Sequence, residues 1–165
     1  MTISETLVPE FDQEMATLRK LVDRVPEDKF SWKPHAKSMT LGRLASHVSE
    51  MSRWASFIIN QDTFEMTPGQ APFNAATKAE LMAALDKNVA DARALIAGAS
   101  DEQLGKNWSF LYGGHVVMEM PRAAALRTVV MNHIIHHRGQ LSVFLRLLDV
   151  PIPSIYGPSA DEPIG

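Results

Sequence analysis

The sequence has 165 residues, of which 45% are apolar and 21% charged, a composition that excludes a disordered chain and predicts one globular domain over residues 1–165. The 16 Lys and Arg residues against 19 Asp and Glu give a net charge of -3, so no surplus of positive charge supports nucleic-acid binding. The absence of cysteine excludes disulfides, thiolate metal ligands and a cysteine nucleophile.

Regularly spaced apolar residues predict two helices near the N-terminus. The first covers residues 7–25, where leucines and valines recur at three-to-four spacing after a cap at Thr2 or Ser4. Pro26 follows this helix and ends it. After a second stretch that contains proline, Thr40 suits the N-cap of a helix that reaches about residue 60.

The middle of the chain predicts a loop, a third helix and an irregular segment. Residues 61–76 are rich in Pro, Gly and small polar residues, which favours a connecting loop. Thr77, with Glu80 three residues later, forms a capping box before a helix over residues 78–97. Glycines punctuate residues 98–120, where the run WSFLYGGHVVM is compatible with a short extended piece rather than a helix.

A long fourth helix is predicted from Pro121, which suits a first helical turn, to about Asp149, where prolines prevent continuation. From about residue 150 the tail is too rich in Pro and Gly for regular structure, so we expect it extended on the surface or on a neighbouring molecule. Four amphipathic helices with little strand signal predict an all-α four-helix bundle. The long connections 26–39 and 98–120 predict a crossover or irregular topology.

No membrane segment or leader is expected from this sequence. The N-terminal stretch is acidic where a signal peptide needs basic residues, and no run approaches about 18 uninterrupted apolar residues. We therefore expect a cytoplasmic protein with no membrane contact.

Three histidines stand on apolar helix faces. In the run NHIIHHRGQ, about 100° of rotation per residue turns His133, His137 and Gln140 to one side, with His137 inside the apolar stripe and His133 at its edge. His136 lies on the flank. His47 is likewise surrounded by apolar positions of the second helix. Buried imidazoles need partners, and three that converge are satisfied by one shared cation, which predicts a three-histidine metal site with at least one open position.

Histidines and charged residues near such a site also have ordinary structural roles open to them. A histidine on an apolar face is often satisfied by a backbone carbonyl, and His35 and His115 are expected to be ordinary solvated residues of loops. Glu50, one turn from His47, fits a fourth ligand, a base or a salt-bridged side chain. Arg138 fits a partner of a carboxylate, a grip for an anion or a surface residue.

Two long motifs resemble the DinB/YfiT-like family of metal-dependent enzymes, which is unrelated to the DNA polymerase that shares its first name. They are FSWKPHAKSMTLGRLASHVSEM at residues 30–51 and MNHIIHHRGQLSVFLRLLDVPIPSIYGPSADE at residues 131–162. The resemblance covers nearly the whole chain. It implies an up-down-down-up four-helix bundle, often dimeric, with a divalent metal held by His47, His133 and His137. Characterised relatives include isomerases and S-transferases that use low-molecular-weight thiols.

The leading functional hypothesis is therefore an enzyme whose metal activates a low-molecular-weight thiol or water for S-transfer or isomerisation of a small-molecule substrate. The alternatives are a metal-dependent hydrolase and a non-catalytic, metal-stabilised binding protein of a stress response. Zinc or nickel is the expected metal, with iron or copper as further options. Glu50 and Gln140, each about one turn from a ligand, are the candidates for orienting ligands or handling protons. A homodimer is expected from the resemblance.

Overall fold

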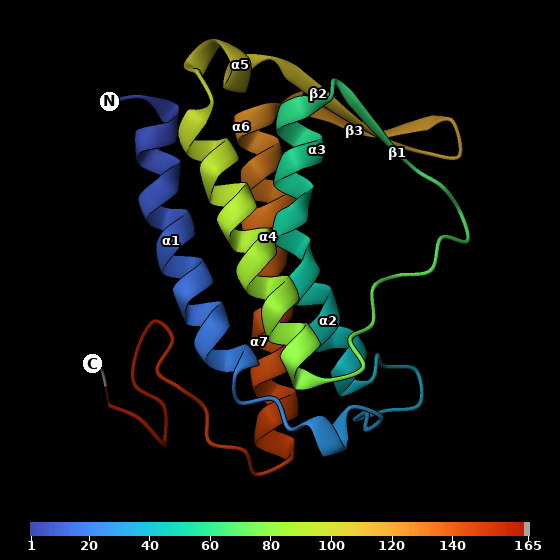
Figure 1. Cartoon of the computed structure of the whole chain (residues 1–165), viewed down its shortest axis with the longest axis vertical. Helices are drawn as coiled ribbons and strands as arrows, with labels where there is room; N and C mark the ends of the chain where they lie inside the picture. The colour runs from blue at the N-terminus through green and yellow to red at the C-terminus, as the bar shows by residue number, and fades with distance from the viewer. Residues whose placement is uncertain (164–165) are drawn as a thin grey trace.

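The computed structural model describes residues 1–163 and is mostly helical (Figure 1). The α-helices are α1 (Ile3–Val22), α2 (Leu41–Glu50), α3 (Trp54–Asn60), α4 (Lys78–Gly98), α5 (Asp101–Gly105), α6 (Arg122–Ala125) and α7 (Asn132–Leu147). Short 3₁₀ turns, η1 (Glu27–Lys29) and η2 (Met51–Arg53), and a π-helical turn, η3 (Leu126–Met131), accompany them.

Side-chain caps fix where the first and third predicted helices begin. The Thr2 hydroxyl accepts a hydrogen bond from the Glu5 amide at 3.2 Å, and the Glu5 carboxylate accepts one from the Thr2 amide at 2.7 Å. This capping box confirms Thr2, one of the two predicted caps, as the residue that starts α1. At α4 the Thr77 hydroxyl caps the Glu80 amide as expected, but the Glu80 carboxylate accepts from the amide of Ala76 rather than that of Thr77.

The second and fourth predicted helices are interrupted. The 3₁₀ turn η2 separates α2 from α3, and the π-helical turn η3 separates α6 from α7. Pro121 is the last residue of a strand rather than the first turn of a helix. Such turns change the rotational phase of the residues that follow, which an unbroken apolar period does not reveal.

The all-α prediction is wrong because the fold includes a three-stranded sheet of β1 (Thr63–Met66), β2 (Asn107–Tyr112) and β3 (His115–Pro121). Strand β1 runs parallel to β2, and β3 runs antiparallel to it. Gly113 and Gly114, with φ of 58° and 80°, make the tight turn between β2 and β3, where other residues would be strained. The extended piece expected here is confirmed, and His115 begins β3 instead of lying in a loop.

The core lies between the long helices. Helix α4 packs against α1, α2 and α3, while α7 packs against α1 and α2, and the sheet covers one end of these helices (Figure 1). Leucine, isoleucine, valine and methionine side chains fill the interior together with Phe11 and Trp108, both fully buried. The up-down-down-up order of the helices stays a prediction.

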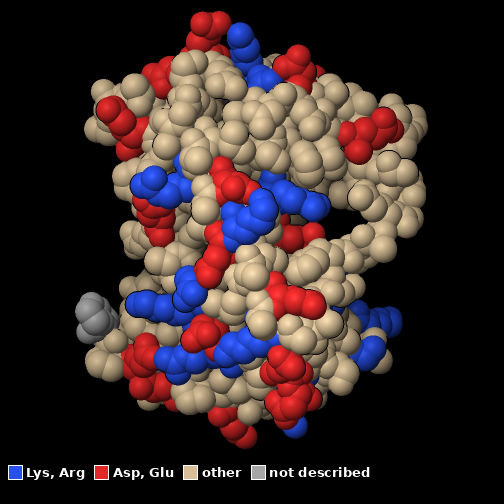
Figure 2. Space-filling view, in the orientation of Figure 1, with Lys and Arg blue, Asp and Glu red and all other residues tan. Residues whose placement is uncertain are grey.

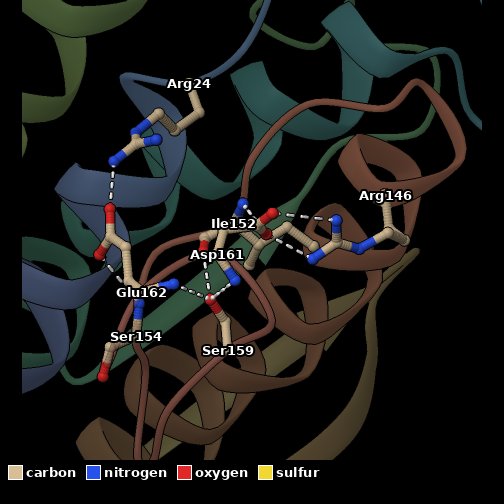
Figure 3. Close-up of polar contacts among 7 residues, drawn as sticks. All are labelled: Arg24, Arg146, Ile152, Ser154, Ser159, Asp161 and Glu162. Carbon is tan, nitrogen blue, oxygen red and sulfur yellow. Dashed lines mark hydrogen bonds and ion pairs between the residues drawn. The ribbon is translucent and has the colours of Figure 1, made fainter. Parts of the chain in front are cut away.

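The tail after residue 150 has no regular secondary structure over its described part, as expected, and it folds back on its own chain. Figure 3 shows the contacts that hold it. The Asp161 carboxylate accepts hydrogen bonds from Arg146 at 2.5 Å and from the Ile152 amide at 2.9 Å. Glu162 pairs with Arg24 of the segment after α1 at 2.5 Å.

Charges of both signs are interspersed on the face of the molecule that Figure 2 presents. Within residues 1–163, no helix combines the length and the apolar character that a membrane crossing requires.

Candidate metal centre

Three imidazoles meet between α2 and α7, as predicted from the sequence. His47 projects from α2, and His133 and His137 project from successive turns of α7. One ring nitrogen of each lies within 4.8 Å of the others. The Nε2 atoms of His133 and His137 are only 2.9 Å apart. His137 is 8% exposed and His133 is half-buried, in agreement with their expected positions inside and at the edge of the apolar stripe.

Two backbone hydrogen bonds hold the start of α2 against the preceding loop and so fix the position of the helix that carries His47. The Leu41 amide donates to the Trp32 carbonyl at 2.7 Å, and the Gly42 amide donates to the Phe30 carbonyl at 2.9 Å. A Cβ atom on Gly42 would lie 2.9 Å from the Cβ of Phe30, so only glycine allows this approach.

A hydrogen bond outside the cluster sets the tautomer of His137. The Nδ1 atom of His137 lies 2.7 Å from the Oε1 atom of Gln140. Because an amide oxygen only accepts, Nδ1 carries the proton and Nε2 presents a lone pair. The contact of His133 with the backbone of Val129 raises its pKa, whereas burial and the neighbouring imidazoles lower it. The Nε2 atom of His133 faces that of His137, and its tautomer decides whether it donates to His137 or presents a second lone pair.

The environment of His133 and His137 favours the neutral imidazole. Burial, reinforced by the neighbouring His137 and His47, lowers the pKa of His133 to about 4. Burial is also the largest cause that lowers the pKa of His137. Both rings are then neutral imidazoles at neutral pH, the form that coordinates a metal ion. Three neutral imidazole nitrogens suit a divalent transition metal.

Comparison with known proteins agrees with this geometry. Residues 1–164 match the model of the DinB family. The chain belongs to the DinB family. The uncharacterized protein YrdA of Bacillus subtilis strain 168 is 25% identical over 151 residues, which cover 90% of this chain and 85% of YrdA.

Two solved structures share the fold of this DinB-family chain. A DinB-like protein from Bacillus cereus ATCC 10987 has a TM-score of 0.71 at 23% identity, covering 92% of this chain and 97% of that one. The DinB-like protein YjoA from Bacillus subtilis has a TM-score of 0.67 at 20% identity, covering 90% and 96% of the two chains. At these identities the likeness shows the fold alone.

Glu50 of this DinB-family protein lies beside the cluster without joining the three converging ring nitrogens. Its side chain is 13% exposed and lies 3.8 Å from the Nδ1 atom of His47. That nitrogen is buried and has no hydrogen-bond partner among residues 1–163. The Glu50 carboxylate also faces Arg43 at 3.7 Å and Arg53 at 3.9 Å. Of the roles considered for Glu50, the salt-bridged one fits these contacts.

Arg138 pairs with a carboxylate away from the cluster. It is 2% exposed, and its guanidinium lies 2.6 Å from the carboxylate of Glu14 in α1 and donates to the Tyr156 hydroxyl at 2.8 Å. Burial, followed by the hydrogen bond to Glu14, raises the pKa of Tyr156. The pairing alternative for Arg138 is thus observed, although the sequence did not identify its partners. His35 is exposed in a loop, as expected.

Cavities border the cluster on two sides. One, of about 550 Å³, is lined by His47 and Glu50 and enclosed by the residues that follow β1. The other, of about 430 Å³, is lined by His137 and Gln140. Sequence reasoning missed the arginines and aromatic residues of the larger cavity, because they come together only through the fold.

Proposed function

We propose that this DinB-family protein is a metal-dependent enzyme in which His47, His133 and His137 hold one divalent transition metal, with zinc or nickel as the first candidates. The observation that carries the proposal is the convergence of three imidazoles, with one ring nitrogen of each within 4.8 Å of the others and the Nε2 atom of His137 left as an acceptor by the hydrogen bond to Gln140. When bound, such an ion supplies a Lewis acid that lowers the pKa of a coordinated thiol or water.

The residues around the cluster have separate tasks in this proposal. Gln140 holds the ring of His137 with its lone pair inward. Glu50 places a carboxylate 3.8 Å from the Nδ1 atom of His47, on one side of the third ring. Gln140 also contacts His136 at 3.2 Å, which links the buried ring of His137 to an exposed one.

Two cavities on different sides of the cluster support a reaction between two small molecules. Because the chain has no cysteine, a thiol nucleophile must come from a separate low-molecular-weight molecule. We therefore place S-transfer or thiol-dependent isomerisation first and metal-dependent hydrolysis second. The access that these cavities give to the cluster disfavours a purely structural metal.

Metal stoichiometry tests the site. After reconstitution with zinc and removal of excess ion, the wild type is expected to retain about one zinc ion per chain, as a single site of this kind holds. His133→Ala should lose the ion, whereas His35→Ala, which changes an exposed loop histidine, should keep it. Equal zinc content in the two variants rules out the assignment.

Cobalt substitution tests the chemistry. We expect a low-molecular-weight thiol to give cobalt-loaded protein an intense near-ultraviolet charge-transfer band that the His137→Ala variant lacks. Unchanged spectra with a range of thiols, together with ester or amide hydrolysis that depends on pH near about 7, would instead favour the hydrolase.

A further inference from the structure

The larger cavity joins an aromatic wall to a cationic end. Trp54, Phe57 and Phe64 line one part of it, and Arg43 and Arg53 line the part next to Glu50. In Figure 2 the cavity is seen as a dark hollow at the right, between the helices and the arm of chain that follows β1. Its volume of about 550 Å³ is in the range of small-molecule sites.

The aromatic wall, formed by Trp54, Phe57 and Phe64, is held in place by contacts among its own rings. Phe57 and Phe64 are stacked with ring centroids 4.3 Å apart and planes 12° apart. Trp54 meets Phe64 edge-on at 5.1 Å. These rings support one another, and Phe64 is only half-buried although it packs against the core. An aromatic ligand could stack here at little cost in side-chain entropy.

The cationic end carries more positive charge than its acid neutralises. Among the described residues that line the cavity, Arg43 and Arg53 face the single carboxylate of Glu50. Their distances to it, 3.7 and 3.9 Å, are ion-pair distances too long for hydrogen bonds. The Arg43 guanidinium also donates a hydrogen bond to the Phe73 carbonyl at 3.3 Å. Arg53 is 53% exposed, and its guanidinium lies 5.6 Å from the centre of the Phe57 ring.

Arg53 therefore has donors left for an anion directly beside the aromatic wall. A guanidinium is a planar fork that matches a carboxylate with two parallel hydrogen bonds. Glu50, on the His47 side, would repel an anion that approached without pairing to the arginines. The charges thus favour a ligand with one carboxylate and one flat apolar body.

We propose that this cavity binds a small aromatic carboxylate, with its ring on Phe57 and Phe64 and its carboxylate on Arg53. The inference rests on the proposed function in one respect, namely that such a ligand, held beside His47, is a substrate of the metal centre. The binding itself belongs to the protein side chains and does not need the metal.

Calorimetry on the full chain, stripped of metal by a chelator, tests the binding. The probes are naphthalene-2-carboxylate and its neutral isostere naphthalene-2-carboxamide. We expect the carboxylate to bind about tenfold more tightly, since a charge-assisted pair is worth roughly 1.4 kcal/mol or more. Arg53→Gln should remove this preference. Arg19→Gln, which deletes the same charge from an exposed pair with Asp86, should retain it.

A second variant tests whether the aromatic wall contributes to ligand binding. Phe64→Ala, checked for unchanged helical circular dichroism, should weaken naphthalene-2-carboxylate at least about tenfold, because stacked and buried aromatic area is lost. The inference is overturned if the metal-free protein binds neither probe, if Arg53→Gln keeps the preference, or if Arg19→Gln loses it equally. Zinc retention measured on a separate, zinc-reconstituted sample of each variant distinguishes the two proposals, because a chain that fails to retain zinc there but prefers the carboxylate when metal-free contradicts only the metal centre.

Discussion

Gln140 decides which nitrogen of His137 can serve as a ligand. Its amide oxygen accepts from Nδ1 at 2.7 Å, and its amide nitrogen lies 3.2 Å from the Nε2 atom of His136. With the oxygen held on this side, the opposite ring nitrogen of His137 must present its lone pair to the cluster. Gln140 therefore orients a ligand and need not touch a metal itself.

Replacing Gln140 should weaken metal binding without removing any ligand. We expect Gln140→Leu to lower zinc affinity by about 10- to 100-fold, the usual cost of losing an orienting partner. Gln140→Glu, which keeps an acceptor oxygen, should recover most of it. A competition titration with a coloured chelator measures both. Ser142→Ala, on the same helix with its hydroxyl on the Gly139 carbonyl, is the control, and an affinity loss of the same size there would argue against a specific role for Gln140.

At the scale of elements, the contact between the start of α2 and the preceding loop controls the position of the histidine cluster. Gly42 is in contact with Phe30, and the helix that begins there carries His47. Glycine inside a helix costs up to about 1 kcal/mol relative to alanine. The close approach keeps glycine at this position despite that cost, because a methyl group has no room.

Two glycine-to-alanine variants separate these effects. Gly42→Ala should lower the free energy of unfolding by about 1 to 3 kcal/mol, because the clash with Phe30 exceeds the gain in helix propensity. Gly139→Ala, in α7 where an added Cβ meets nothing within 4 Å, should raise it by up to about 1 kcal/mol. Urea denaturation measures both changes. A stabilised Gly42→Ala variant would mean that the contact between Gly42 and Phe30 leaves room for a methyl group.

Sequence periodicity predicted the long helices because each buries one face continuously, and it predicted the β2–β3 region because paired glycines interrupt apolar residues. It missed β1, whose four residues are too few to show a period and which pairs with a distant strand. It also missed the turns η2 and η3, which change helical phase without changing composition.

The candidate site was predictable where its residues share apolar helix faces. His47, His133 and His137 are polar groups at positions of otherwise apolar stripes, a pattern visible in one dimension. Arg43 and Arg53 carry no such signal. Their place beside Phe64 depends on how β1 and the chain after it fold back over α2 and α3, which local patterns do not encode.

For the whole molecule, the tail closes one end through ionic contacts that depend on pH. Pairing with Arg146, and then the Ile152 amide, lowers the pKa of Asp161 below its ordinary value. A depressed folded-state pKa adds stability above the unfolded value and loses it as the pH falls through the folded one. The melting temperatures of wild type and Asp161→Asn should therefore differ most near neutral pH and converge in acid. A difference that does not shrink as the pH is lowered past the ordinary Asp value of about 4 would contradict this role.

The parallel pairing of β1 with β2 also sets an order of assembly. All of α4 lies between these strands in the chain, so their hydrogen bonds close a long loop whose entropy must be lost before any pairing is gained. The sheet should consequently form after α4 has docked, and Phe64 should reach its partners late in folding. The histidine cluster closes a still longer loop, because α2 precedes β1 and α7 follows β3 in the chain, so it should form no earlier than the sheet. A refolding chain would then acquire the aromatic side of the cavity before its ability to bind an ion, and rapid-mixing experiments could time the two events separately.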